Sequence, residues 1–403
     1  MDLIIRNAQI VGESKKKDIG IKNGEIIEVG EINDDSSEEI NADGRLTSPA
    51  FIDPHIHLDK ALIADELPPN ESGTLNEAIE LIWERKRKYT IDDIKRRAKK
   101  VIQLGISNGT TRMRTHVDVD TIGGLTPLEG LLETKKDIKD QIGLQIAAFP
   151  QEGIVRDSGT EELLRKAMEK GADLIGGMPH HEKSPNDMKE HVDMVFEIAK
   201  EFDVDIDMHV DETDDPNSRS LEYVAEKTMK EGYKGRVTAG HTCALAAYPD
   251  DYARKVIQKV KKAEMNVITN PATNLVIQGR EDNQPIRRGI TRVKELLEAG
   301  VNVTFGQDCV SDAFYPFGKA DMLEVALITA HAAHLTMPED IETIFKMMTN
   351  NAAKTLGVQD DYGVKPGVTA DLVIIDAPTP KEAIRLQPGR WVIRKGRIVS
   401  SPQ

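Results

Sequence analysis

The sequence predicts an α/β protein, a (β/α)8 TIM barrel with a small β-sandwich domain formed from both chain termini. Three observations predict it: both ends are rich in short strands, the middle alternates strand and helix patterns, and 403 residues exceed a usual single core. We place the small β domain at residues 1–48 plus 363–403 and the barrel at residues 49–362.

The two chain ends carry matching strand signals. At the N-terminus LIIRNAQIV is followed by DIGIKNGEIIEVG, in which Asn23-Gly24 is a hairpin signal. At the C-terminus ADLVIIDAP precedes RWVIRKGRIVS, with a glycine-bearing turn expected between strands. Chain ends commonly lie close together, so both ends can build one small domain.

The middle of the chain alternates apolar runs with helical patterns, such as those over 76–104, 186–202 and 290–299. With the run before His55 we count eight strand–helix units, which favours a barrel. A doubly wound sheet is the alternative, but no GxGxxG follows the first strand. The strand candidates after the first are 110–117, 144–150, 172–178, 204–210, 235–241, 265–271 and 301–308.

Composition excludes several classes of function. The chain has 53 basic and 68 acidic residues, a net charge of -15, which argues against nucleic acid or an anionic membrane as partner. Two cysteines, Cys243 and Cys309, predict no disulfide framework and a reducing, cytoplasmic location. We see no signal peptide, and no apolar run approaches the roughly 18 residues of a membrane span.

The motif PHIHLD carries the first functional signal. His55 and His57 stand two apart at the end of an apolar run. Side chains at i and i+2 of a strand share one face, so both imidazoles can reach one ion.

Other predicted strand ends complete this set, because a barrel gathers its strand ends at one mouth. His209, His241 and Asp308 lie at three of them. Three imidazoles and a carboxylate suit one zinc or ferrous ion, with a water at the remaining position. Strand four offers no lysine to bridge two metals, which favours one ion.

Glu212, three residues beyond His209, is placed to shuttle a proton, although a solvent-facing loop glutamate is the simpler interpretation. His241 either ligates or holds the attacking water, and Asp308 can both bind metal and accept the water's proton. The remaining histidines are interpreted as supporting, rim, surface or packing groups: His116, His180, His181, His191, His331 and His334.

These residues stand within longer stretches that resemble the amidohydrolase superfamily and, within it, the cytosine deaminase group. The resemblance covers most of the barrel in the same order. The matching stretches are PHIHLD (54–59), SGTL (72–75), RTHVDVD (114–120), AAFPQEGI (147–154), HVDETDD (209–215), GHT (240–242), NPATNLVIQGR (270–280), RRGITRVKELLEAGVNV (287–303) and FGQDCVSDAFYPFG (305–318).

The resemblance implies roles for matching positions. One iron or zinc ion per chain would be held by His55, His57, His209 and Asp308. The resemblance further implies that Glu212 shuttles a proton to the ring nitrogen, His241 orients the water and Asp308 deprotonates it. The resemblance implies that the side-chain amide of Gln151 binds the carbonyl and the adjacent N–H of the ring. The implied walls around the ring are Phe149, Leu75, Phe314 and Cys309.

Two departures from the cytosine deaminase pattern affect selectivity. Cys309 stands where that group usually has a second aspartate, and Phe314 where it usually has tryptophan. Both changes favour a substituted or differently shaped ring. The opening DLIIRNA, the run HLDK and EFDVDIDMH also resemble triazine-degrading aminohydrolases.

We therefore expect a metal-dependent hydrolase that deaminates a small N-heterocycle, cytosine or a close analogue, and that assembles into a homo-oligomer. The alternatives are removal of an amine or alkylamine from a triazine such as ammelide, ring-opening hydrolysis of a cyclic amide, and a non-catalytic barrel subunit. The missing strand-four lysine opposes ring opening, and the retained metal ligands oppose the non-catalytic subunit.

Overall fold

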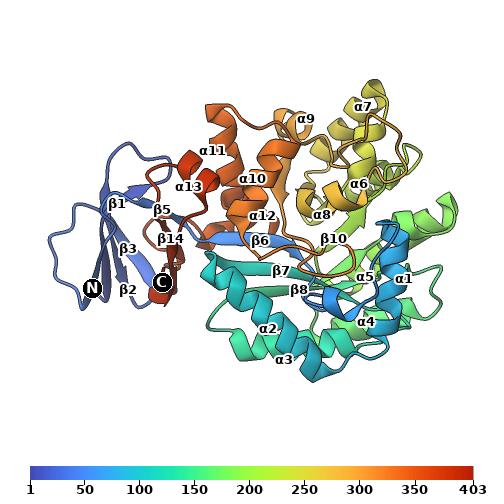
Figure 1. The fold of residues 1–403 in the computed structure, drawn as a ribbon, viewed down its shortest axis with the longest axis horizontal. Helices are drawn as coiled ribbons and strands as arrows, with labels where there is room; N and C mark the ends of the chain where they lie inside the picture. Colours follow the sequence, from blue (N-terminus) through green and yellow to red (C-terminus); the bar gives the residue numbers. More distant parts are fainter. Residues whose placement is uncertain (403) are drawn as a thin grey trace.

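The computed structural model describes residues 1–402 and confirms the predicted fold class. Eight parallel strands follow one another in chain order, and an isolated bridge between Ile56 and Asp308 joins the last to the first. In Figure 1 these strands run through the centre of the larger lobe with helices around them. The barrel strands are β6 (Phe51–Ile56), β7 (Thr110–Asp118), β8 (Gly143–Phe149), β9 (Leu174–Gly177), β10 (Ile206–Val210), β11 (Val237–His241), β12 (Asn266–Thr269) and β13 (Asn302–Phe305).

The barrel strands are buried because helices cover their outer face. All six residues of β6 and all five of β10 are buried, the pattern expected of a parallel sheet covered on both sides. The helices over residues 75–355 are α1 (Leu75–Lys86), α2 (Ile91–Ser107), α3 (Thr126–Ile138), α4 (Thr160–Lys170), α5 (Pro185–Phe202), α6 (Ser220–Lys230), α7 (Asp250–Lys262), α8 (Pro271–Ile277), α9 (Val293–Glu298), α10 (Met322–Ala332), α11 (Pro338–Met347) and α12 (Asn350–Thr355).

The helical pattern predicted over 76–104 is two helices, α1 and α2. The Thr90 hydroxyl accepts a hydrogen bond from the backbone N–H of Asp93 and begins α2 as its N-cap. The break lets α1 leave the outer ring, and its residue Leu75 lines a pocket with His57 and Asp308 at the strand ends. The sequence does mark the break, because residues 84–88 are all charged and Thr90 stands three residues before Asp93, and the single pattern over 76–104 missed it.

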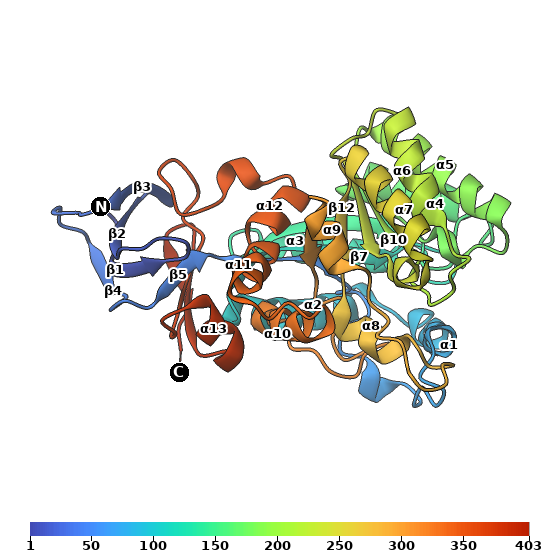
Figure 2. The same cartoon turned by 90° about the horizontal axis from the view of Figure 1, so that it is seen from above.

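The second sheet contains strands from both chain ends, in the order β16-β15-β14-β5-β1-β2-β3, with β4 paired to β1. Both termini lie in this smaller lobe, beside the barrel (Figures 1 and 2). Its strands are β1 (Leu3–Ile10), β2 (Lys17–Lys22), β3 (Glu25–Gly30), β4 (Glu38–Asn41), β5 (Leu46–Pro49), β14 (Leu372–Ile375), β15 (Arg390–Arg394) and β16 (Arg397–Ser400). The boundaries 1–48 with 363–403, and 49–362, stay a prediction.

The C-terminal strands differ from the expected arrangement in one respect. A helix, α13 (Pro380–Leu386), stands between β14 and β15, and it contacts α10 and α11. The glycine-bearing turn, at Gly396, instead joins β15 to β16 within the run RWVIRKGRIVS. Among residues 1–402, no helix combines the length and apolar character that crossing a membrane requires.

Candidate metal centre and active site

Four predicted side chains converge at the C-terminal ends of the barrel strands. Ligand atoms of His55, His57, His209 and Asp308 all lie within 4.8 Å of one another, and all four residues are buried. The Nε2 atoms of His57 and His209 are 3.1 Å apart. The Oδ1 of Asp308 lies 3.5 Å from the Nε2 of His55 and 3.4 Å from that of His57.

Backbone pairing between the first and last strands fixes this convergence. The N–H of Asp308 donates to the carbonyl of His55 over 2.7 Å, and the N–H of His57 donates to the carbonyl of Asp308 over 2.9 Å. Asp308 has φ 64°, an unfavourable conformation for a residue with a Cβ. Strain of this kind is commonly found where a side chain is held for function.

The electrostatics of the four residues suit a cation. Burial lowers the pKa of His55 and His209 well below the usual value, so their nitrogens keep lone pairs. Burial and Lys60 lower the pKa of His57 to about 4. Burial raises the pKa of Asp308, but nearby histidines outweigh this and hold it well below its usual value. Neutral imidazoles and one carboxylate are the donor set that zinc or iron takes.

His116 supports this cluster from behind. Its ring centroid is 4.2 Å from that of His55, and its Nε2 lies 3.3 Å from the Oδ1 of Asp207. The guanidinium of Arg114 donates to the other oxygen of Asp207 over 2.7 Å. Asp207 is therefore held between two partners, and it fixes the position of the His116 ring under His55.

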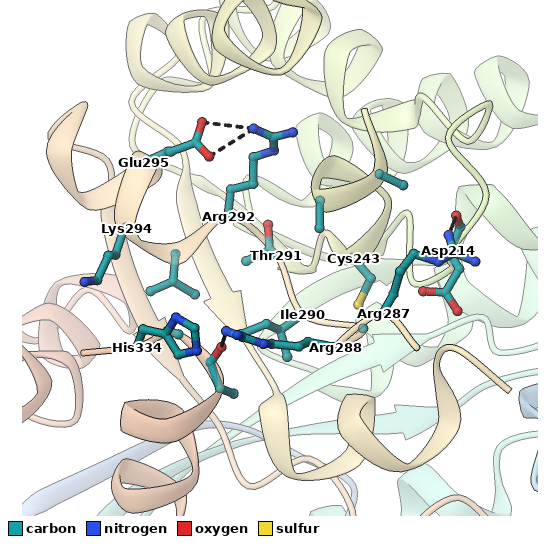
Figure 3. A pocket seen from close by; sticks show the side chains of 16 residues that line it. Asp214, Cys243, Arg287, Arg288, Ile290, Thr291, Arg292, Lys294, Glu295 and His334 are labelled. Carbon is teal, nitrogen blue, oxygen red and sulfur yellow. Dashed lines mark hydrogen bonds and ion pairs between the residues drawn. The ribbon is translucent and has the colours of Figure 1, made fainter. Parts of the chain in front are cut away.

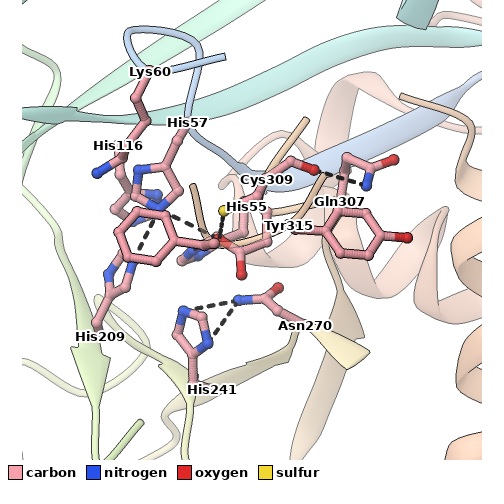
Figure 4. A network of polar contacts seen from close by, with 12 residues as sticks. His55, His57, Lys60, His116, His209, His241, Asn270, Gln307, Cys309 and Tyr315 are labelled. Atoms are coloured by element: carbon pink, nitrogen blue, oxygen red, sulfur yellow. Dashed lines mark hydrogen bonds and ion pairs between the residues drawn. The ribbon is translucent and has the colours of Figure 1, made fainter. Parts of the chain in front are cut away.

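Glu212 and His241 form a pair beside the four-residue cluster. The Oε1 of Glu212 lies 2.9 Å from the Nδ1 of His241. The side-chain amide of Asn274 donates to the same Glu212 oxygen over 2.9 Å. The amide nitrogen of Asn270 lies 3.1 Å from the Nε2 of His241 (Figure 4). Burial lowers the pKa of His241, but the carboxylates of Glu212 and Asp308 outweigh it and raise it to about 9.

A narrow pocket lies between Glu212 and the cluster that contains His57, His209 and Asp308. Its free volume is about 20 Å³, near that of one water. The pocket is lined by His57, Lys60, Leu75, Gln151, His209, Glu212, Thr273, Ile277, Asp308, Cys309 and Phe314.

The predicted substrate contacts are all near this pocket. Leu75, Gln151, Cys309 and Phe314 line it directly. Phe149 does not line it but stacks on the ring of His209, with centroids 4.1 Å apart and planes 24° from parallel. Phe149 therefore packs against His209, a candidate metal-binding residue, and does not form part of the pocket wall.

Outside the pocket mouth lies a larger cavity of about 510 Å³. It shares Leu75, Glu212 and Ile277 with the narrow pocket, and His180 and His181 line it. The structure therefore places His180 and His181 at the rim of the pocket, one of the two positions expected for them.

The other three histidines lie away from the pocket. His191 is a packed group as expected, because its ring is fully buried and its two nitrogens contact Glu182 and the N–H of Met178. His331 and His334 are exposed. His334 follows the end of α10 rather than lying within it.

A separate cavity of about 390 Å³ contains none of the predicted site residues (Figure 3). Arginine and lysine side chains surround it, and Arg292 is paired with Glu295 at its edge. Among the described residues, its walls include none of the candidate metal-binding groups.

Sequence reasoning did not assign three residues of the site. Asn274 positions Glu212, and its signal was the run NPATN, which was noted only as part of a resemblance. Lys60 faces the pocket, and its signal was the lysine of HLDK. Asp118 pairs with Lys60 over 2.7 Å, and its signal was the run RTHVDVD, which was noted only as part of the resemblance.

Comparisons with known proteins agree with this geometry. Residues 38–400 match the model of the Amidohydrolase family. A solved structure of 5-methylcytosine deaminase from Klebsiella pneumoniae, liganded with 5-fluorocytosine, is 37% identical, covers 99% of this chain and 98% of its own, and has a TM-score of 0.96. N-isopropylammelide isopropyl amidohydrolase of Pseudomonas sp. (strain ADP) is 35% identical over 99% of this chain and 97% of its own length. Pterin deaminase of Rhizobium rhizogenes is 32% identical over 95% and 88%.

Proposed function

The chain belongs to the amidohydrolase family and is a hydrolase acting on C–N bonds of N-heterocycles, and we propose that it deaminates cytosine or a 5-substituted cytosine. The observation that carries the proposal is the placement of Glu212. It stands beside the three-histidine, one-aspartate cluster, pairs with His241 and lines the same narrow pocket as Gln151.

One divalent ion, zinc or iron, would be held by His55, His57, His209 and Asp308. When bound, such an ion lowers the pKa of a coordinated water toward neutrality. The fit rests on two observations: the His57 and His209 nitrogens face each other at 3.1 Å, and the second Asp308 oxygen is buried without a hydrogen-bond partner.

The side chains divide the proton transfers among them. Glu212 carries one proton of the attacking water to the ring nitrogen next to the amine-bearing carbon, so that the ring carries no negative charge as the water adds. Asp308 accepts the other proton of that water as the carbonyl forms and delivers it to the departing ammonia. His241 holds the attacking water in line. A ring carbonyl and ammonia are the products.

The pocket walls favour a single flat ring. Gln151 lies at the ring edge that carries a carbonyl and an N–H, and its side-chain amide contacts that edge. Leu75 and Phe314 pack against the ring, and Phe149 stacks behind them on His209. Cys309 gives a small, weakly polar wall where a ring substituent fits, and the 37% identical relative is itself a 5-methylcytosine deaminase.

The second candidate is hydrolysis of an amine or alkylamine from a triazine such as ammelide. The 35% identical relative is an N-isopropylammelide isopropyl amidohydrolase, and this observation supports the alternative. A homo-oligomeric state and a cytoplasmic location stay predictions.

The test is an ammonia-release assay with protein loaded separately with zinc and ferrous iron. The substrate panel contains cytosine, 5-methylcytosine, N-isopropylammelide and pterin, with isopropylamine release followed for the third. We expect the highest kcat/KM for one of the two cytosines. Highest kcat/KM for N-isopropylammelide would replace the proposal with its alternative, and turnover of none of the four would reject both.

A further inference from the structure

Resting on the proposed function, we propose that Lys60 is a specificity-determining residue that donates a hydrogen bond to a ring carbonyl of the substrate, while Gln151 accepts the adjacent ring N–H. The favoured substrates are therefore amino-heterocycles that carry an oxo group next to a ring N–H. A ring that lacks this oxo group is disfavoured.

Lys60 is buried at the pocket wall with one donor to spare. It is 1% exposed, and its Nζ donates to the Oδ1 of Asp118 over 2.7 Å and to the Oε1 of Gln151 over 2.8 Å. A lysine ammonium has three N–H donors. Only these two hydrogen bonds are found for it among the described residues, and an unpaired buried donor is costly. Because Lys60 lines the narrow pocket, its third N–H is available to donate to a molecule bound there.

The contact with Lys60 also fixes which way the Gln151 amide points. An ammonium donates and never accepts, so the atom that faces Lys60 is the amide oxygen. The amide nitrogen is turned toward the sulfur of Met178, 3.2 Å away. Gln151 therefore offers the pocket the second lone pair of its oxygen, which suits a ring N–H, and the carbonyl donor must come from elsewhere.

A cluster of buried charges holds Lys60 in this position. Asp118 faces two lysines, with Lys60 at 2.7 Å from one oxygen and Lys86 at 2.7 Å from the other. Lys86 also contacts Asp120 at 2.6 Å and Glu152 at 3.3 Å, but it does not line the pocket. Lys60 is further enclosed by the rings of Phe149 and Phe314, each centred 5.6 Å from its Nζ.

These contacts make Lys86 a matched control. Both lysines pair with Asp118 inside the same cluster, so Lys86→Met reports what the loss of a buried lysine there does to the fold. Only Lys60 presents a donor to the pocket. A purely structural role for Lys60 would make the two variants behave alike toward every substrate.

The experiment compares the metal-loaded wild type, Lys60→Met, Lys60→Arg and Lys86→Met in two measurements. The first is kcat/KM for cytosine and for 4-aminopyrimidine, which lacks the oxo group. The second is the Kd of uracil, an oxo ring without an exocyclic amine, by calorimetry. If Lys60→Met does not fold, Lys60→Met with Asp118→Asn also removes the carboxylate that has lost a partner and takes its place.

We expect Lys60→Met to lose roughly 10- to 100-fold in kcat/KM for cytosine and in uracil affinity, the value of one hydrogen bond from a charged donor. Its kcat/KM for 4-aminopyrimidine should change little, and Lys60→Arg should recover part of the loss. Lys86→Met should leave the ratio of the two substrates as in wild type.

An unchanged substrate ratio and an unchanged uracil Kd in Lys60→Met would overturn the inference while leaving the deaminase proposal intact. Uracil binding that depends on Lys60 without turnover of any amino-heterocycle would uphold the inference and reject the deaminase. Neither binding nor turnover by the wild type would reject both.

Discussion

The Oε1 of Glu212 lies 2.9 Å from the Nδ1 of His241, and both side chains are buried next to the cluster of His55, His57, His209 and Asp308. A carboxylate and an imidazole are thus held together beside the four residues that we propose bind a cation. Asn274 donates to the same Glu212 oxygen, so that oxygen has a fixed position while the other can face a substrate. This division is the basis for assigning proton transfer to Glu212.

Glu212→Gln should lower kcat by about 10²- to 10⁴-fold, because the amide keeps the shape of the carboxylate but cannot carry a proton to the ring. Metal content should stay as in wild type, since Glu212 is not among the four ligands. Steady-state kinetics and elemental analysis of the same sample check both points. Glu281→Gln, at the exposed rim of the outer cavity, is the control. Full activity in Glu212→Gln would remove this residue from the mechanism.

Cys309→Asp should shift selectivity toward cytosine and away from 5-methylcytosine, by roughly 10-fold in the ratio of kcat/KM values, the effect of one methyl group on a pocket wall. The change places a carboxylate in a small, weakly polar wall beside Asp308. Cys309→Ser, which keeps the size, should retain the wild-type ratio. Competition between the two substrates measures the ratio directly, and an unaltered ranking in Cys309→Asp would mean that this position does not set selectivity.

Removal of the metal should abolish ammonia release and lower stability by about 2–4 kcal/mol at metal concentrations well above Kd. The reason is that four buried ligands then lose their common partner. Dialysis against a chelator, followed by thermal unfolding and re-addition of zinc or ferrous iron, checks this. Activity that persists in metal-free protein would contradict the assignment.

Asp312 should make stability depend on pH. Burial raises its pKa to about 7, although hydrogen bonds from the N–H groups of Phe314 and Tyr315 act against it. The folded protein then binds more protons than the unfolded chain between about pH 4 and 7, so this stabilising contribution falls as pH rises through 7. Asp312→Asn keeps both hydrogen bonds and removes the titration.

Between pH 5 and pH 8, Asp312→Asn should therefore gain about 2–3 kcal/mol of unfolding free energy relative to wild type. Denaturant unfolding of both metal-loaded proteins at the two pH values measures the difference. An Asp312→Asn effect that is the same at pH 5 and pH 8 would show that the Asp312 carboxyl titrates normally.

The sequence was sufficient for the barrel and for the residues at its mouth, because strand-end histidines such as His55 and His209 follow apolar runs and barrel topology gathers strand ends. It was insufficient where side chains from different elements decide the outcome. The separation of α1 from α2 at the Thr90 cap had a local signal that the pattern over 76–104 passed over. The helix α13 lies where a turn between strands was expected.

The site shows the same division. Asn274 and Lys60 act through contacts with Glu212 and Gln151, which are 62 and 91 residues away along the chain. A single sequence carries no record of such partners. The Gln151 amide looks free to serve as donor and acceptor from sequence alone, and only the position of Lys60 reveals that its oxygen is already engaged.

The most direct test of the metal centre is the metal content per chain of reconstituted, gel-filtered protein, measured by elemental analysis for the wild type and for a His57→Ala, His209→Ala double variant. The account predicts about one zinc or iron per chain in the wild type and almost none in the folded double variant. A wild type without metal, or a double variant that keeps the full content, would contradict it.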